Sequence, residues 1–426
     1  MNKCKLGDLF YIKQGFAFKS EKYVSQSPYV LCTLGNFSES NNFKFNPDKA
    51  TYYPDEFSHD FILQENDLIM PLTEQVVGLF GNTAFVPKTK DFQFVLNQRV
   101  GKIIPYSEKA DKIFLHYLLS TELVRNQIEA TASGTKQRNT SPDKIYDVTV
   151  WVPNVTAQRI IGQRLYALEQ KINNNIRICS ELESMAKMLY DYWFVQFDFP
   201  DENGKPYRTS GGEMVWNDQL KREIPKGWKV KPLSYGIKSI NTGLNPRDNF
   251  SLGKGNIQYV TVKNLTTAGT IDFSGCDTLD EEAKSMVHTR SDISIGDILF
   301  ASIAPLGRCY LIQSTPKNWD INESVFSIRA NPEVVTSEFL YMYFMSNVFI
   351  KGATSSSTGS IFKGIRINTL LDIVAIFPPK HVVDAFTSKV KTLLELKEEK
   401  AEENRELTKL RDWLLPMLMN GQATVK

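Results

Sequence analysis

Residues 155–196 read VTAQRIIGQRLYALEQKINNNIRICSELESMAKMLYDYWFVQ, and this stretch decides the fold. Along it, a seam of mostly apolar residues recurs at alternating steps of four and three: Ile161, Leu165, Leu168, Ile172, Asn175, Cys179, Leu182, Ala186, Leu189 and Trp193. Such alternation is a heptad pattern. The stretch holds no proline and only one glycine, Gly162. We therefore predict a single long helix, which at about 1.5 Å per residue would span roughly 60 Å.

A second stretch near the end of the sequence, residues 380–421, has a related pattern. Its apolar positions are Phe386, Val390, Leu393, Leu407, Leu410, Leu414 and Leu418. The charged residues 397–406 weaken the seam in the middle. Because each helix has one apolar stripe, we expect the two helices to pair with each other within the chain. Dimerisation of two chains through the same stripes is the alternative.

The two stretches belong to an internal repeat with an offset of 225 residues. Repeats of this kind indicate duplicated structural units. The matching pairs are Phe114 and Phe339, Gly134 and Gly359, Asp147 and Asp372, Pro153 and Pro378, Leu182 and Leu407, and Leu189 and Leu414. With small gaps the match extends upstream, where residues 66–70 resemble 296–300 and residues 96–98 resemble 321–323.

The repeat predicts an α+β protein with two globular domains, each followed by a long helix. Short β-rich runs broken by Gly, Pro and Asn fill the first part of each copy, and helical patterns follow at residues 112–129 and 337–350. The expected boundaries are 1–154 for the first domain, 155–196 for its helix, 197–230 for an ordered connector, 231–379 for the second domain and 380–421 for its helix.

Composition is that of a globular protein, with 42% hydrophobic and 23% charged residues. The longest apolar runs, such as 373–377, are far shorter than the roughly 20 residues that a membrane span needs, and no secretory segment follows the first residues. The five cysteines are scattered, without zinc-ligand spacing. We expect free thiols and a cytoplasmic protein with no membrane association.

No recognisable catalytic motif is present. The sequence has no GxxxxGK[ST] phosphate loop and no GxGxxG for a dinucleotide or S-adenosylmethionine. The four histidines, His59, His116, His288 and His381, stand apart from one another and are interpreted as surface or packing residues. We expect neither metal nor cofactor in this chain. A binding function is favoured over an enzymatic one.

Two polar loops at the same place in each copy are the first candidates for DNA contact. The first holds Lys136, Gln137, Arg138 and Asn139, whose side chain types make paired hydrogen bonds to guanine and adenine edges. The second holds Ser360, Lys363 and Arg366, which suit phosphate contact. Either loop alone could be an ordinary solvated turn. Their equivalent positions favour the functional interpretation.

Weaker candidates lie near the start of each domain. Lys19 belongs to a flexible polar stretch at residues 14–19, Arg247 belongs to a similar one at 241–247, and Lys263 follows an expected strand. These cations could equally be solvated surface charges. The net charge of +2 by itself gives no sign of a polyanionic partner.

The layout closely resembles the specificity subunit of type I restriction-modification systems, over essentially the whole chain. The residues that carry the resemblance are 6–9 (LGDL), 66–69 (NDLI), 296–299 (GDIL), 133–135 (SGT), 193–200 (WFVQFDFP) and 225–228 (PKGW). Each motif is short and loose. Together with the duplication they make the match specific.

The resemblance implies two target-recognition domains, each reading one half of a bipartite asymmetric site on double-stranded DNA. It implies that the two helices pair antiparallel, with pseudo-twofold symmetry, as a coiled coil that sets the gap between the half-sites. Methyltransferase (modification) subunits would dock on the helices, whose stripes include Leu165, Leu168, Leu182, Leu189, Leu393, Leu407 and Leu414. Restriction subunits would complete the complex, and S-adenosylmethionine, ATP and Mg would be held by the partners.

Two other classes of function compete with this interpretation. A coiled-coil scaffold with two protein-binding domains agrees with the near-zero net charge. It predicts no salt-dependent DNA binding, whereas phosphate contacts release counterions. A stand-alone nuclease or methyltransferase predicts turnover by the purified chain that depends on a metal or on S-adenosylmethionine.

Overall fold

The computed structural model describes residues 1–423 except 39–40, 76–77, 136, 305–306 and 357–363. The chain forms two compact units. Unit 1 comprises Met1–Asn173 and Glu406–Lys426, and unit 2 comprises Asn174–Arg405. The chain passes between the units at residues 173–174 and 405–406. Both points lie inside long helices, α4 (Val155–Tyr190) and α9 (Lys380–Met419).

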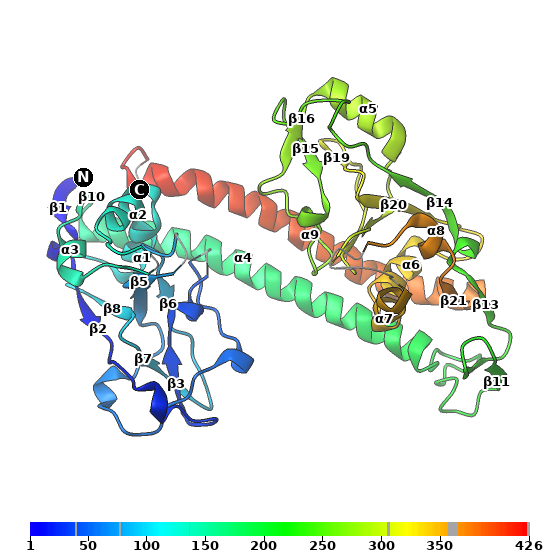
Figure 1. The fold of residues 1–426 in the computed structure, drawn as a ribbon, viewed down its shortest axis with the longest axis horizontal. Coiled ribbons are helices and arrows are strands. Elements are labelled where there is room, and N and C mark those ends of the chain that lie inside the picture. Colours follow the sequence, from blue (N-terminus) through cyan, green and yellow to red (C-terminus); the bar gives the residue numbers. More distant parts are fainter. Residues whose placement is uncertain (39–40, 76–77, 136, 305–306, 357–363, 424–426) are drawn as a thin grey trace. The chain divides into compact units, whose positions relative to one another are not determined.

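Unit 1 is built on a four-stranded antiparallel sheet in the order β2-β8-β4-β6. Figure 1 labels β2, β8 and β6 of this sheet. A parallel pair, β3 and β7, lies in the same unit, as do the antiparallel pairs β1 with β10 and β5 with β9. The strands are β1 (Asn2–Lys5), β2 (Phe10–Gln14), β3 (Tyr29–Cys32), β4 (Leu68–Pro71), β5 (Thr73–Glu74), β6 (Ala84–Phe85), β7 (Gln93–Leu96), β8 (Val100–Pro105), β9 (Arg138–Asn139) and β10 (Thr149–Val152). The helices are α1 (Lys112–Ser120), α2 (Glu122–Ala130) and α3 (Pro142–Tyr146), with short 3-10 turns at Leu6–Asp8, Ser20–Lys22, Leu34–Asn36, Pro47–Lys49 and His59–Phe61.

Unit 2 repeats this plan. Its four-stranded antiparallel sheet has the order β14-β20-β17-β18, and β15 pairs with β19 in parallel. The strands are β11 (Met214–Asn217), β12 (Arg222–Pro225), β13 (Lys229–Pro232), β14 (Ile237–Thr242), β15 (Ile257–Val260), β16 (Asp277–Leu279), β17 (Ile298–Ala301), β18 (Cys309–Leu311), β19 (Trp319–Ile321), β20 (Val325–Ala330) and β21 (Val374–Phe377). The helices are α5 (Glu281–Ser291), α6 (Ser337–Phe344), α7 (Asn347–Ser356) and α8 (Ile367–Leu371), with 3-10 turns at Leu233–Tyr235 and Val262–Asn264.

The motif shared by residues 66–69 and 296–299 forms the same turn in both units. Asn66 and Gly296 have positive φ angles of 65° and 88°, the left-handed region that Asn and Gly tolerate best. The aspartate that follows each of them accepts a backbone hydrogen bond from three residues upstream. It also pairs with a cation on the neighbouring strand, Lys102 for Asp67 and Arg329 for Asp297. The motif therefore has a structural role, because it forms the turn that precedes β4 and β17.

The expected helices at 112–129 and 337–350 are each split in two. Thr121 lies in an extended conformation between α1 and α2, and its side chain bonds the carbonyl of Leu118. In unit 2 the break comes at residues 345–346, where the Ser346 side chain bonds the carbonyl of Tyr343. Ser and Thr side chains compete with the helical backbone in this way. Helix α5 was not predicted, because its eleven residues have little apolar periodicity.

Helices α4 and α9 pack together. Within unit 2, the buried Asn175 amide donates to Glu403 and Asn404, both at 3.0 Å. Lys397 is also buried and donates to Glu183 at 3.0 Å. Within unit 1, Leu165 of α4 and Leu418 of α9 belong to one apolar core.

Helix α4 ends in a π-helical turn, Asp191–Val195, followed by Phe197 with a φ of 65°. The connector is ordered: β11 and β12 form a hairpin, and Trp228 packs edge-on against Phe197. Among the described residues, no helix is both long and apolar enough to cross a membrane.

Candidate nucleic-acid interface

In unit 1, the predicted polar segments gather at one end of the four-stranded sheet. Strands β2 and β4 end there, and β8 and β6 begin there, because Gln14 pairs with Gly101 and Pro71 pairs with Val100. The stretch at residues 15–19 and the loops that follow β4 therefore leave from the same edge. The first residue pair of β5 and β9, Thr73 with Asn139, brings the loop at 133–139 to this edge as well.

Unit 2 has the same arrangement. Strands β14 and β17 end where β20 begins, because Thr242 pairs with Phe326 and Ala301 pairs with Val325. An isolated bridge between Ile303 and Gly364 places Gly364 at this edge. The backbone N–H of Ile365 donates to the carbonyl of Ser302 at 2.7 Å, which completes the pairing.

The guanidinium of Arg138 makes ion pairs within unit 1. It donates to Glu74 at 2.9 Å and to Glu129 at 2.7 Å, and Glu74 is only 1% exposed. Its second nitrogen donates to the carbonyl of Glu129. These contacts anchor the loop to β5 and α2, and the prediction that Arg138 contacts DNA stays a prediction.

The other predicted residues of this loop differ in exposure. Asn139 is exposed, and its side chain oxygen accepts from Thr73 at 2.9 Å and from Gln137 at 3.2 Å. Gly134 has a φ of 119°, and a Cβ there would lie 2.1 Å from the carbonyl oxygen of Gln137, so only glycine permits this turn. Lys136 lies outside the described residues.

The predicted cations elsewhere at the two edges are exposed. These are Lys19 in unit 1 and Arg247, Lys263 and Arg366 in unit 2. Lys263 stands in the 3-10 turn that follows β15, and Arg366 precedes the first turn of α8. None of their side chains makes an ion pair with another residue in the described part of the chain. Ser360 and Lys363 lie outside the described residues.

The sequence argument missed two turns at these edges, residues 97–99 and 322–324. The match between residues 96–98 and 321–323 was visible in the sequence, but nothing local indicated that the turns lie beside the stretches that follow β2 and β14. In the structure, the backbone of Phe16 bonds both Leu96 and Gln98, and Gly243 bonds Asn322.

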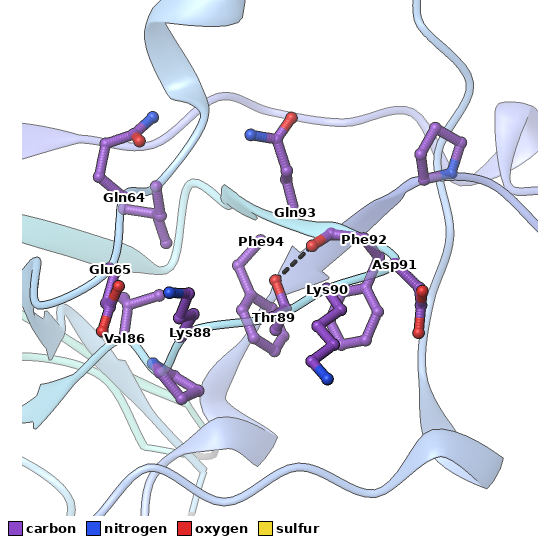
Figure 2. A pocket seen from close by; sticks show the side chains of 13 residues that line it. Gln64, Glu65, Val86, Lys88, Thr89, Lys90, Asp91, Phe92, Gln93 and Phe94 are labelled. Atoms are coloured by element: carbon purple, nitrogen blue, oxygen red, sulfur yellow. Dashed lines mark hydrogen bonds between the residues drawn. The ribbon is translucent and has the colours of Figure 1, made fainter.

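A pocket of about 390 Å³ lies at the opposite end of the unit 1 sheet. Its walls are residues 63–65 and the loop 86–94, and Figure 2 shows Thr89 bonding the carbonyl of Phe92 within that loop. No residue that we predicted to contact DNA lines it. Within the described ranges, no group of three or more His, Cys, Asp or Glu residues could hold a metal ion.

The leucines that we assigned to partner docking face inward. Leu165 is fully buried and Leu182 is 9% exposed. Leu189 and Leu393 pack against the core of unit 2, and Leu414 packs against that of unit 1. Leu168 and Leu407 are half-buried. These residues mainly hold the helices in place and offer little exposed apolar surface to another subunit.

Other apolar residues of the two helices are exposed. Met185 and Met188 of α4 are 49% and 64% exposed, and Leu410 and Trp413 of α9 are 42% and 60% exposed. We name these pairs the α4 patch and the α9 patch. Leu410, which we placed on the apolar seam, belongs instead to the exposed surface. The patches occupy equivalent positions, because their members differ by 225 residues.

Comparison with known proteins agrees with this architecture. Residues 1–184 match the family model described as type I restriction modification DNA specificity domain. The MjaIX specificity subunit of Methanocaldococcus jannaschii is 25% identical over 342 residues, which cover 78% of this chain and 73% of the relative. The HindI specificity subunit of Haemophilus influenzae is 24% identical over 400 residues, covering 80% and 84%.

Residues 1–184 thus match the specificity domain of type I restriction-modification systems, and most of the chain is similar to specificity subunits of such systems. A solved structure, the S subunit of such a system from M. genitalium, shares the fold with a TM-score of 0.60 at 16% identity, over 98% of this chain and 96% of that one. Specificity subunits are the non-catalytic DNA-recognition components of these enzymes.

Proposed function

We propose that this specificity subunit reads a bipartite, asymmetric site on double-stranded DNA, with one half-site read by each unit. The observation that carries the proposal is the repetition of one loop-bearing sheet edge in both units. The unit 1 edge presents the exposed Lys19 and Asn139, and the unit 2 edge presents exposed cations, Arg247, Lys263 and Arg366. Cations suit phosphate contact, and an amide side chain suits a base edge. Since the exposed residues of the two edges differ, the two half-sites differ.

The partners in this proposal are modification subunits, which would supply the methyltransferase activity, and restriction subunits, which would complete the nuclease. S-adenosylmethionine, ATP and Mg would be bound by these partners. This chain would hold none of them, and the assembly would act in the cytoplasm.

The α4 and α9 patches are the proposed docking sites of the modification subunits. Exposed apolar clusters mark interaction surfaces, and Met and Trp are enriched in protein interfaces. The duplication of the patch in two equivalent positions supports two copies of one partner. The buried leucines then act indirectly, because they fix the helical face on which each patch stands.

We further propose that α4 and α9 form an antiparallel coiled coil that sets the gap between the half-sites. The order of their contacts supports this orientation: Asn175 bonds Glu403, while Glu183, further along α4, bonds Lys397, earlier in α9. The pairing of two duplicated helices in opposite directions is what a pseudo-twofold axis requires. Both crossings between the units lie in these helices.

Insertion of seven residues into each helix, at 173–174 and 405–406, is expected to lengthen the gap in the recognised site by about three base pairs. Two helical turns add about 10.5 Å and keep the heptad register, and duplex DNA rises about 3.4 Å per base pair. Methylome sequencing measures the gap. An unchanged gap in an insertion variant that still methylates DNA would contradict the proposal that the paired helices set the gap.

The proposed function itself is tested in a host without DNA methylation. The chain is expressed with its cognate modification subunit, and the modification subunit alone is the control. Methyladenine at a two-part motif, present only with this chain, is the expected result. Absence of any motif, with both proteins assembled, would overturn DNA reading and favour the scaffold interpretation. A DNA affinity that does not change with salt concentration would then support the scaffold interpretation.

A further inference from the structure

The two sheet edges share a backbone frame that extends into the most diverged part of the repeat. After each first parallel strand comes the same box, Thr33 with Asn36 in unit 1 and Thr261 with Asn264 in unit 2. In each box the Asn oxygen accepts from the Thr backbone, at 2.8 and 2.9 Å. Each buried Asn amide then bonds a backbone carbonyl eight residues on, at 3.0 Å in both units.

A second part of the frame follows the other parallel strand. The Asn97 oxygen accepts from the backbone of Arg99 at 3.2 Å, and the Asn322 oxygen accepts from that of Ser324 at 3.1 Å. A glycine packs directly on each of these turns. A Cβ on Gly15 would lie 2.1 Å from the Asn97 carbonyl oxygen, and one on Gly243 would lie 1.7 Å from that of Ile321. Neither glycine can be replaced without moving the turn.

On this common frame, the residue at the tip of the second turn differs between the units. Gln98 occupies it in unit 1 and Glu323 occupies it in unit 2, and both are exposed. Gln98 is held in place through its backbone, which donates to Phe16 at 2.9 Å. Glu323 lies near the hydroxyl of Tyr259, which donates to the carbonyl of Leu244 at 2.6 Å.

The surroundings of the two tips point to DNA. Phe16 is 42% exposed, and an aromatic ring on a polar edge can stack on a base. In unit 2, Arg247 and Lys263 stand on the same edge as Glu323. A carboxylate at a DNA surface repels phosphate, whereas it can accept hydrogen bonds from the donor groups of bases.

We propose that Gln98 and Glu323 are equivalent specificity-determining residues, each reading a base in its own half-site. The inference rests on the proposed function and names side chains within it. A glutamine amide both donates and accepts, which matches adenine, whereas a carboxylate only accepts, which matches the amino group of cytosine. The shared frame places both residues at the same backbone position, and the difference in their chemistry makes the half-sites different.

The test exchanges the two residues, as Gln98→Glu and Glu323→Gln, in the complex with the modification subunit. Each change is isosteric and on an exposed turn. Methylome sequencing is expected to show that Gln98→Glu alters only one half of the motif and Glu323→Gln alters only the other. Methylation of the original site should fall about tenfold to a hundredfold in each variant.

Matched controls make the same changes away from the two edges. The controls are Gln93→Glu and Glu333→Gln. Gln93 is exposed at the start of β7, and Glu333 is exposed in the turn that follows β20, so both lie away from the two edges. Both should keep the wild-type motif and level. An unchanged motif in Gln98→Glu and Glu323→Gln would overturn this inference, as would an equal loss of specificity in both halves of the motif. The proposal that the chain reads DNA would still stand if the wild type gave a two-part motif. Absence of a motif in the wild type would overturn both.

Discussion

Replacement of Met188 and Trp413 by glutamate is expected to abolish assembly with the modification subunit while leaving this chain folded. Both side chains are exposed, 64% and 60%, so their replacement removes no core contact. At an interface, a charge in place of a central apolar side chain remains unpaired and desolvated. Loss of such a residue commonly costs 2 kcal/mol or more, which is about thirtyfold in affinity.

The two single variants carry more information than the double variant. Met188→Glu removes the α4 patch and Trp413→Glu removes the α9 patch, so each is expected to reduce the stoichiometry from two modification subunits to one. Native mass spectrometry measures this directly. Trp216→Glu is the matched control, because Trp216 is 61% exposed on the connector hairpin and belongs to neither patch. Two bound subunits in all variants would contradict the docking proposal.

The second large effect concerns stability. Glu169→Ala is expected to destabilise unit 1 by about 3–5 kcal/mol, the usual cost of removing one partner from a buried charged network. Glu169 is 6% exposed and accepts from the hydroxyl of Tyr117 at 2.6 Å. The buried His116 lies 3.7 Å from it, and the other ring nitrogen of His116 bonds Thr83 at 2.7 Å. Removal of the carboxylate leaves the Tyr117 hydroxyl without its acceptor and His116 without its charged partner.

The same carboxylate predicts a pH dependence. Burial raises the pKa of Glu169, but the interaction with His116, the hydrogen bond from Tyr117 and the charge of Arg411 outweigh it, so the pKa lies below its ordinary value of 4.5. A lowered pKa stabilises the folded state above the unfolded pKa, and this contribution is lost as pH falls through the folded value. The difference in unfolding free energy between wild type and Glu169→Gln should therefore shrink as the pH is lowered below about 4.5.

Urea unfolding at neutral and acidic pH measures both effects. Glu181→Gln is the matched control, because Glu181 is exposed on the same helix and its only ion pair in the described structure is a long one to Arg177, at 3.9 Å. That variant should be close to wild type at every pH. Equal stability of Glu169→Ala and wild type at neutral pH would show that the network does not hold α1 to α4.

The family resemblance, the internal repeat and the two long helices could be recognised from the sequence alone, because local or periodic sequence patterns indicate each of them. A heptad stripe can be recognised from the helical period alone. The duplication can be recognised because the two copies keep similar residues where the backbone conformation restricts the choice of residue. The polar loops could be nominated for the same reason. Gly134 and the Asp67 and Asp297 turns illustrate how local geometry restricts residue choice.

Only the tertiary structure decided which of the nominated side chains are free. Arg138 resembles a base-reading residue in the sequence, and only the structure shows that Glu74, 64 residues away, forms an ion pair with it across the β5–β9 pair. Leu410 lies on the heptad stripe but is exposed, since the width of the buried face depends on what packs against each helix. Gln98 reaches the stretch after β2 through the parallel bridge between Phe16 and Asn97, which has no signal in the local sequence. Periodicity thus determined the elements, while contacts between distant segments determined which residues remain available for DNA and for partners.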